Sequence, residues 1–218
     1  MLTLSLRQAS PTPSHVLCLG AHSDDIEIGC GGAMLSLLEA SPPLTVTWVV
    51  FGAQGMRVEE ARQSAESFLA AAVKREIVIH GFCDGFFPYA GAQIKETFEA
   101  LKARISPDLV FTHYRHDLHQ DHRLIAELTW NTFRDHLVLE YEIPKYDGDL
   151  GVPNLFVPLD DALCRRKIDT ILTSFASQRD KPWFSEDLFR SLLRLRGMEC
   201  NAPSTYAEAF YVRKLVVG

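Results

Sequence analysis

The 218-residue chain has the composition of an ordinary globular protein, with 47% apolar residues and a formal net charge of −6. No stretch approaches about 18 uninterrupted apolar residues, which argues against a membrane span. The acidic balance, without a dense basic run, argues against nucleic acid as a partner. Five cysteines without a Cys-x-x-Cys pair fit a reducing compartment better than a disulfide framework. The N-terminal residues lack the features of a signal peptide, so we expect a cytoplasmic protein.

Predicted strands and helices alternate along most of the chain. Apolar and β-branched runs predict strands over 15–20, 44–51, 76–80, 108–112, 137–143, 154–159 and 209–217. Helical periodicity and boundary residues predict helices over 28–40, 59–72, 94–105, 122–136, 160–176 and 185–194. This order predicts a Rossmann-like, doubly wound α/β fold with a mostly parallel sheet and helices on both faces. We expect a single domain over residues 1–218, with residues 1–14 as a lead-in segment.

Three polar residues, His22, Asp24 and Asp25, follow directly after the first predicted strand. Ligands of open parallel sheets bind outside the carboxyl ends of the strands, where this turn is expected. Imidazole and carboxylate are ordinary zinc ligands, and His22 and Asp25 are spaced to point to one side of a helical turn. The alternative is a helix cap, which aspartate commonly forms. A catalytic zinc site needs about three protein ligands, so a third must come from elsewhere in the chain.

A second polar cluster follows the fourth predicted strand. Residues 111–123 hold four of the eight histidines, and His119, Asp121 and His122 precede a predicted helix. Two strand-end turns with complementary ligands would face one cleft of a parallel sheet. His113 and His116 are expected to be wall or surface residues and not ligands.

Both clusters resemble motifs of a known family. Residues 21–27, Ala-His-Ser-Asp-Asp-Ile-Glu, followed by the glycines within 29–32, resemble the Ala-His-Pro-Asp-Asp signature of the LmbE-like (PIG-L) zinc N-deacetylases. Residues 119–123, His-Gln-Asp-His-Arg, resemble the family's second motif, His-Pro-Asp-His. Ser23 and Gln120 replace prolines that donate no ligand.

Two weaker matches lie outside these motifs. Arg62 and Glu66 resemble an Arg-x-x-x-Glu helix of the family, although a plain helix ion pair would have the same spacing. Residues 207–210, Ala-Glu-Ala-Phe, resemble the family's C-terminal Glu-Ala-Phe.

The resemblance implies a Zn²⁺ ion held by His22, Asp25 and His122, with Fe²⁺ or Mn²⁺ as alternatives in the cell. It implies that Asp24 is the general base that removes a proton from the attacking water.

The resemblance also implies a role for His119 and Asp121. A protonated His119 would face the oxyanion of the tetrahedral intermediate, and Asp121 would hold its ring and keep it charged. Asp117 or His116 could take the role of Asp121 instead.

Candidates for substrate binding lie on two predicted loops: Arg57 after the second strand, and Tyr146 and Asp147 in a turn-rich loop at 144–149. For each of them, a solvated surface residue is the alternative. Gly29, Gly31 and Gly32 do not form Gly-x-Gly-x-x-Gly, so no nucleotide cofactor is expected.

The resemblance implies an enzyme that removes an N-acetyl group from an amino sugar or sugar conjugate. One alternative is a metal-dependent phosphoesterase, which would normally need a second metal cluster. Another is a non-catalytic module that binds metal or carbohydrate, for which the carboxylate of Asp24 would be superfluous. The sequence leaves open the identity of the sugar and whether the protein is a homo-oligomer.

Overall fold

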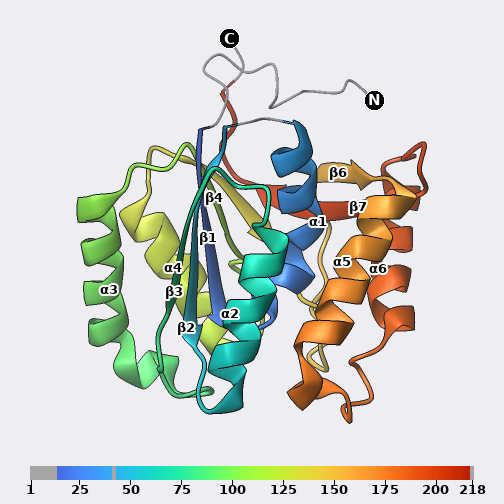
Figure 1. Cartoon of the computed structure of the whole chain (residues 1–218). Coiled ribbons are helices and arrows are strands. Elements are labelled where there is room, and N and C mark those ends of the chain that lie inside the picture. Colours follow the sequence, from blue (N-terminus) through green and yellow to red (C-terminus); the bar gives the residue numbers. More distant parts are fainter. Residues whose placement is uncertain (1–13, 41–42, 217–218) are drawn as a thin grey trace.

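A seven-stranded sheet forms the centre of the computed structural model, which describes residues 14–40 and 43–216 (Figure 1). In sheet order the strands are β3 (Lys74–Ile79), β2 (Thr45–Gly52), β1 (His15–His22), β4 (Leu109–His113), β5 (Leu137–Tyr141), β7 (Tyr206–Val212) and β6 (Leu155–Leu159). The five strands from β3 to β5 are parallel to one another, and β7 runs antiparallel to both of its neighbours. The mostly parallel, doubly wound α/β fold is therefore confirmed.

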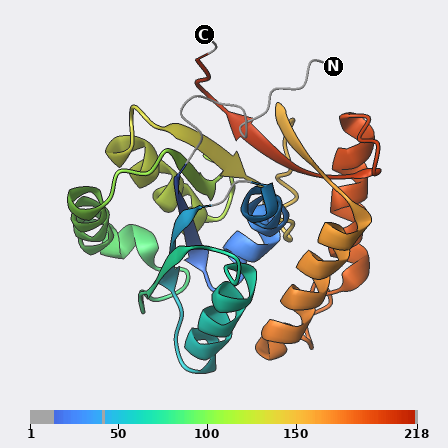
Figure 2. The same cartoon turned by 45° about the horizontal axis from the view of Figure 1, so that its top comes forward.

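The helices cover both faces of the sheet. One face carries α1 (Asp25–Ala40), α2 (Met56–Phe68), α5 (Asp161–Ser174) and α6 (Glu186–Glu199), and the other carries α3 (Gly91–Arg104) and α4 (Gln120–Thr132). Two short 3₁₀ helices, η2 (Phe87–Ala90) and η3 (Ala176–Gln178), interrupt the loops. Figures 1 and 2 show the two helix layers on either side of the strands. No helix of the described residues is long and apolar enough to cross a membrane.

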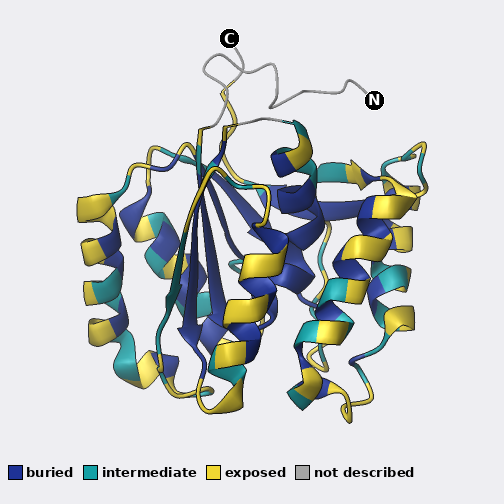
Figure 3. Cartoon of the chain, viewed as in Figure 1, coloured by how far each residue is buried: buried dark blue, intermediate teal, exposed yellow. Residues whose placement is uncertain are grey.

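Strand β1 is buried on both faces, as its continuous apolar run predicts. Val16 and Cys18 belong to the core under α1, α2, α5 and α6, whereas Leu17 and Leu19 belong to the core under α3 and α4. This alternation follows from the two-residue period of a strand. Figure 3 shows the buried strands between the helix layers, which expose their outer sides.

Several boundaries differ from the prediction. Helix α1 begins at Asp25, three residues before the predicted start, so part of the polar turn belongs to the helix. Helix α6 continues to Glu199, beyond the predicted end at 194. Gly197 lies inside it, where a Cβ would be 2.1 Å from the carbonyl oxygen of Thr205. Strand β7 begins at Tyr206 and ends at Val212. Residues 1–13 of the predicted lead-in and residue 217 of the last predicted strand lie outside the described residues.

Candidate metal centre

The two predicted clusters meet at the carboxyl ends of β1 and β4, which are neighbours in the sheet. The chain leaves β1 toward α1 on one face and leaves β4 toward α4 on the other. This is the switch point of a doubly wound sheet, where ligands of such folds bind. His22 is the last residue of β1, Asp25 opens α1, and His122 lies in the first turn of α4.

Three donor atoms form a small triangle at this point. His22 Nδ1 lies 3.2 Å from His122 Nε2 and 3.4 Å from Asp25 Oδ2, and His122 Nε2 lies 3.6 Å from Asp25 Oδ2. All three residues are buried. Zinc bonds of about 2.0–2.2 Å at tetrahedral angles place ligand atoms about 3.3–3.6 Å apart. The triangle therefore has the dimensions of three ligands of one tetrahedral ion.

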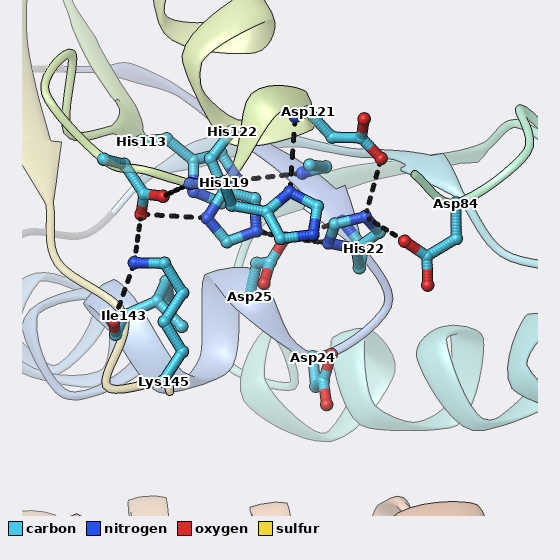
Figure 4. Close-up of polar contacts among 12 residues, drawn as sticks. His22, Asp24, Asp25, Asp84, His113, His119, Asp121, His122, Ile143 and Lys145 are labelled. Carbon is cyan, nitrogen blue, oxygen red and sulfur yellow. Dashed lines mark hydrogen bonds and ion pairs between the residues drawn. The ribbon is translucent and has the colours of Figure 1, made fainter. Parts of the chain in front are cut away.

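The outer nitrogens of both histidines face carboxylates (Figure 4). His122 Nδ1 lies 2.9 Å from Asp117 Oδ2, and His22 Nε2 lies 3.1 Å from Asp84 Oδ1 and 3.2 Å from Asp121 Oδ2. A metal-bound histidine almost always donates its other N–H group to a carboxylate or carbonyl oxygen. With the outer nitrogens as donors to carboxylates, His22 Nδ1 and His122 Nε2 are the nitrogens that would bind an ion.

The electrostatics of the centre favour a cation. Burial lowers the pKa of His122 to about 4, and the neighbouring His113 adds to this effect. Burial alone would raise the pKa of Asp25, but the surrounding imidazole rings bring it well below its usual value. Burial would likewise lower the pKa of His22, yet the carboxylates around its ring, Asp25 foremost, raise it well above its usual value. A positive charge is therefore stabilised at this point, and the donor set fits a divalent ion.

His113 forms a wall of the centre. Its ring is fully buried and stacks on His122, with ring centroids 3.9 Å apart. Its Nε2 lies 3.2 Å from Asp25 Oδ2 and accepts the backbone N–H of Ala21 at 2.9 Å. Because the Nε2 lone pair accepts the Ala21 N–H, it is not free to bind an ion. His116 is exposed.

Asp24 points away from the imidazole rings and lines an open pocket (Figure 4). Its Oδ1 accepts a hydrogen bond from Arg57 Nη2 at 2.9 Å. Burial raises the pKa of Asp24, and Arg57 opposes only part of that rise. Arg57, predicted as a substrate ligand, thus lines the pocket as the partner of Asp24.

The hydrogen bonds of the Asp121 carboxylate run to residues other than His119, so its predicted role beside that ring stays a prediction. The Asp121 carboxylate accepts the backbone N–H groups of Gly85 at 2.7 Å and Phe87 at 3.1 Å, and it faces His22. His119 is the N-cap of α4, and its Nδ1 accepts the backbone N–H of Asp121 at 3.3 Å. Residues two apart at a helix start do not face each other, so the Asp121 carboxylate is directed to the backbone at residues 85–87 and not to the side of His119.

Neither alternative holds the ring of His119 either. Asp117 accepts the backbone N–H of His119 at 2.7 Å, but its carboxylate faces the ring of His122. His116 packs edge-on against Tyr114. His119 Nδ1 accepts a hydrogen bond in this arrangement, which leaves Nε2 as the ring nitrogen that can donate one.

The pocket over the centre has a volume of about 240 Å³ and is open to solvent. The predicted substrate residues Tyr146 and Asp147 line it and are exposed. Its walls also include residues that sequence reasoning missed as site residues: Asp84, Lys145, Gln178, Lys181 and Trp183. The last three come from the connection between α5 and α6, for which the sequence carries no local motif.

The fold and the centre define an α/β protein with a buried histidine–aspartate metal site at its switch point. The chain belongs to the PIG-L family, whose model, described as GlcNAc-PI de-N-acetylase, matches residues 17–133. This match includes both polar clusters, whereas the pocket walls at 143–147 and 178–183 lie outside it. A comparison with curated proteins gave no match.

Solved structures share the fold at low sequence identity. The conserved protein TT1542 from Thermus thermophilus has a TM-score of 0.71 at 18% identity, over 93% of this chain and 96% of that one. The N,N'-diacetylchitobiose deacetylase from Pyrococcus horikoshii has a TM-score of 0.67 at 19% identity, over 95% and 86%. GalB, the 4-carboxy-2-hydroxymuconate hydratase from Pseudomonas putida KT2440, has a TM-score of 0.66 at 15% identity, over 94% and 98%. At these identities the similarity shows the fold alone.

Proposed function

We propose that the protein is a metal-dependent N-deacetylase that removes an acetyl group from an amino sugar or a sugar conjugate. The observation that carries this proposal is the triangle of His22 Nδ1, Asp25 Oδ2 and His122 Nε2 at 3.2–3.6 Å, with a carboxylate behind each histidine. The family match and the deacetylase among the structures of similar fold support the reaction class. Zinc is the expected ion, because its usual ligands are imidazole and carboxylate, and Fe²⁺ or Mn²⁺ are alternatives in the cell.

A bound divalent ion would supply Lewis acidity that polarises the amide carbonyl and lowers the pKa of a coordinated water. Asp24 takes a proton from that water as it attacks the carbonyl carbon. It later delivers the proton to the leaving nitrogen, so that the C–N bond breaks and acetate and a free amine are released. The burial that raises the pKa of Asp24 makes the carboxylate a better proton acceptor, which suits a general base.

His119 stabilises the oxyanion in this proposal as a hydrogen-bond donor. Its ring nitrogens lie near those of His22 and His122, within the group of donor atoms that are no more than 4.8 Å apart. Since Nδ1 accepts the N–H of Asp121, Nε2 carries the proton that can be donated to the carbonyl oxygen. Tyr146 and Asp147 are proposed to contact the sugar from the pocket mouth, with Arg57 at the pocket wall beside Asp24.

The test is amine release from N-acetylated sugars and nucleotide sugars by purified, zinc-loaded protein. We expect release of acetate and amine in equal amounts, and release slower by about 10²–10⁴ with Asp24→Asn protein that carries the same zinc content. Zinc binding and sugar binding without release would indicate the non-catalytic module. Release of phosphate, and not of amine, would indicate a phosphoesterase.

A further inference from the structure

The C-terminal Glu-Ala-Phe segment places a buried carboxylate against the backbone of helix α1. Glu208, on β7, accepts the backbone N–H of Gly32 at 2.7 Å and that of Ala33 at 2.6 Å. Its partner is Lys167 of α5, whose Nζ lies 2.6 Å from Glu208 Oε1 and also donates to the carbonyl oxygen of Ile28 at 2.6 Å. Glu208 and Lys167 are each only 3% exposed. A β-strand, a distant helix and the middle of α1 are thus joined by one ion pair.

The ion pair contacts backbone groups that a regular helix joins to each other. In an α-helix the N–H of residue 32 bonds to the carbonyl of residue 28. Here Lys167 donates to the carbonyl of Ile28, and Glu208 accepts the N–H of Gly32. Hydrogen bonds to charged groups are stronger than neutral ones. The pair therefore holds backbone groups of the first turns of α1, which is a continuous helix over Asp25–Ala40.

Close packing of glycines makes this contact possible. A Cβ on Gly32 would lie 2.9 Å from Glu208 Oε1 and 2.4 Å from Leu159 Cδ1. A larger residue at position 32 would push the carboxylate away from the helix. Glycine is therefore required at position 32 so that Glu208 can approach the helix.

The turn held in this way carries the predicted base and one predicted ligand. Ile28, bonded to Lys167, donates its backbone N–H to the carbonyl oxygen of Asp24 at 3.0 Å. Asp25 lies in the same turn and is one corner of the donor triangle. A shift of this turn would move Asp25 Oδ2 relative to His22 and His122, which other elements hold.

We infer that Glu208 and Lys167 are positioning residues for the metal centre: they fix the first turn of α1, and with it Asp25, against the histidines of β1 and α4. This inference rests on the proposed function, because it assigns the motif a role in metal binding. A positioning role differs from a general role in stability, and a second buried ion pair allows an experiment to separate these two roles.

The matched control is the pair of Glu142 and Arg196. Arg196 Nη2 lies 2.6 Å from Glu142 Oε2, and both residues are buried and line the same small cavity as Glu208 and Lys167. Arg196 donates its side-chain hydrogen bonds to Glu142, to Glu199 and to the carbonyl oxygen of Gly151. None of these bonds reaches α1. Loss of either pair should lower stability, but only loss of the first should disturb Asp25.

The experiment measures zinc affinity of the metal-free full chain by competition with a chromophoric chelator, together with the melting temperature. We expect Glu208→Gln to bind zinc about tenfold more weakly than wild type, the lower end of the usual loss for residues that orient ligands. Glu142→Gln should melt earlier than wild type and keep wild-type zinc affinity.

The double variant Glu208→Gln/Lys167→Met covers the case in which the single variant does not fold, because it leaves no unpaired buried charge. It should also bind zinc about tenfold more weakly. Wild-type affinity in the variant that folds, or an equal loss of affinity in Glu142→Gln, overturns the inference. Wild-type protein that binds no zinc overturns the proposed function as well, so the two failures are distinct.

Discussion

Asp24 and Asp25 are neighbours in the sequence, yet their carboxyl groups lie in opposite electrostatic surroundings. Burial raises the pKa of both groups. Around Asp25 three imidazole rings outweigh the effect of burial and bring its pKa well below the usual value. At Asp24 the main group that opposes burial is Arg57, and the pKa stays raised. A permanently ionised carboxylate suits a ligand, and one that can gain and lose a proton suits a base.

The first prediction follows from this contrast. Asp24→Asn should keep wild-type zinc content, because Asp24 contributes no corner of the triangle, and should lose about 10²–10⁴ in kcat, the usual loss for a general base. Zinc content and kcat for the best substrate of the amine-release screen are the measurements. Asp135→Asn, at a side chain that is 90% exposed and lies outside the pocket, is the control and should keep the wild-type kcat. A near-wild-type kcat in Asp24→Asn would assign the base elsewhere.

Asp121 holds a ligand, and not the ring of His119, so its replacement should affect the metal. The two carboxylate oxygens of Asp121 accept the N–H groups of Gly85 and Phe87 and face that of His22. In Asp121→Asn only one terminal atom is an oxygen, so the amide cannot accept all three N–H groups. We expect zinc affinity to fall about 10–100-fold, as for other carboxylates behind a ligating histidine. Chelator competition measures it, and unchanged affinity would show that Asp84 alone supports His22.

His119→Ala separates a donor from a ligand. The ring lies outside the triangle and its Nδ1 accepts the N–H of Asp121, so zinc affinity should stay at the wild-type value. The kcat should fall about 10²–10³, the usual loss for one oxyanion donor. A loss of zinc together with kcat would instead make His119 a fourth ligand, which its proximity to His22 and His122 allows geometrically.

At the scale of elements, the first turn of α1 is tightly packed against β5. A Cβ on Gly29 would lie 2.1 Å from the ring of Tyr141, whose hydroxyl donates to the carbonyl of Leu19 at 2.7 Å. Gly29→Ala should therefore lower the free energy of unfolding by about 1–3 kcal/mol, the usual cost of overpacking a core. Gly91→Ala, at the start of α3 with nothing within 4 Å, should be neutral or stabilising by up to about 1 kcal/mol. Denaturant titration measures both, and equal stabilities of the two variants would contradict the packing.

The sequence predicted best what is local in the chain. The strand β1, the polar turn after it and the second cluster before α4 are short contiguous patterns, and the structure brings them together as the parallel sheet requires. The pairing of Asp121 with His22 was not predictable, because it depends on the direction of one side chain at a helix start. Trp183 and Lys181 reach the pocket only through the packing of α5 and α6, which no local pattern encodes.

At the scale of the whole molecule, the centre lies where the two hydrophobic cores meet. Strand β1 contributes side chains to both cores, and the triangle draws its corners from β1, from α1 on one face and from α4 on the other. An ion at this point would tie together segments about 100 residues apart in the sequence, which unfolding separates. The unfolded chain cannot reproduce this donor set, so zinc should bind the folded state selectively.

Zinc should therefore stabilise the whole fold. At a free zinc concentration about 1,000-fold above the dissociation constant, selective binding adds about 4 kcal/mol to the free energy of unfolding. For a domain of this length, 1 kcal/mol raises Tm by about 2–4 °C, so zinc should raise Tm by about 8–16 °C over chelator-treated protein. Calorimetry of the zinc-loaded and the chelator-treated protein measures the shift. His122→Ala should largely abolish it, because this variant loses one corner of the triangle and leaves Asp117 without a ligand to orient. Lys181→Met, in the same pocket but outside the triangle, should retain the full shift. Equal melting temperatures of the wild type with and without zinc would contradict a metal centre at this switch point.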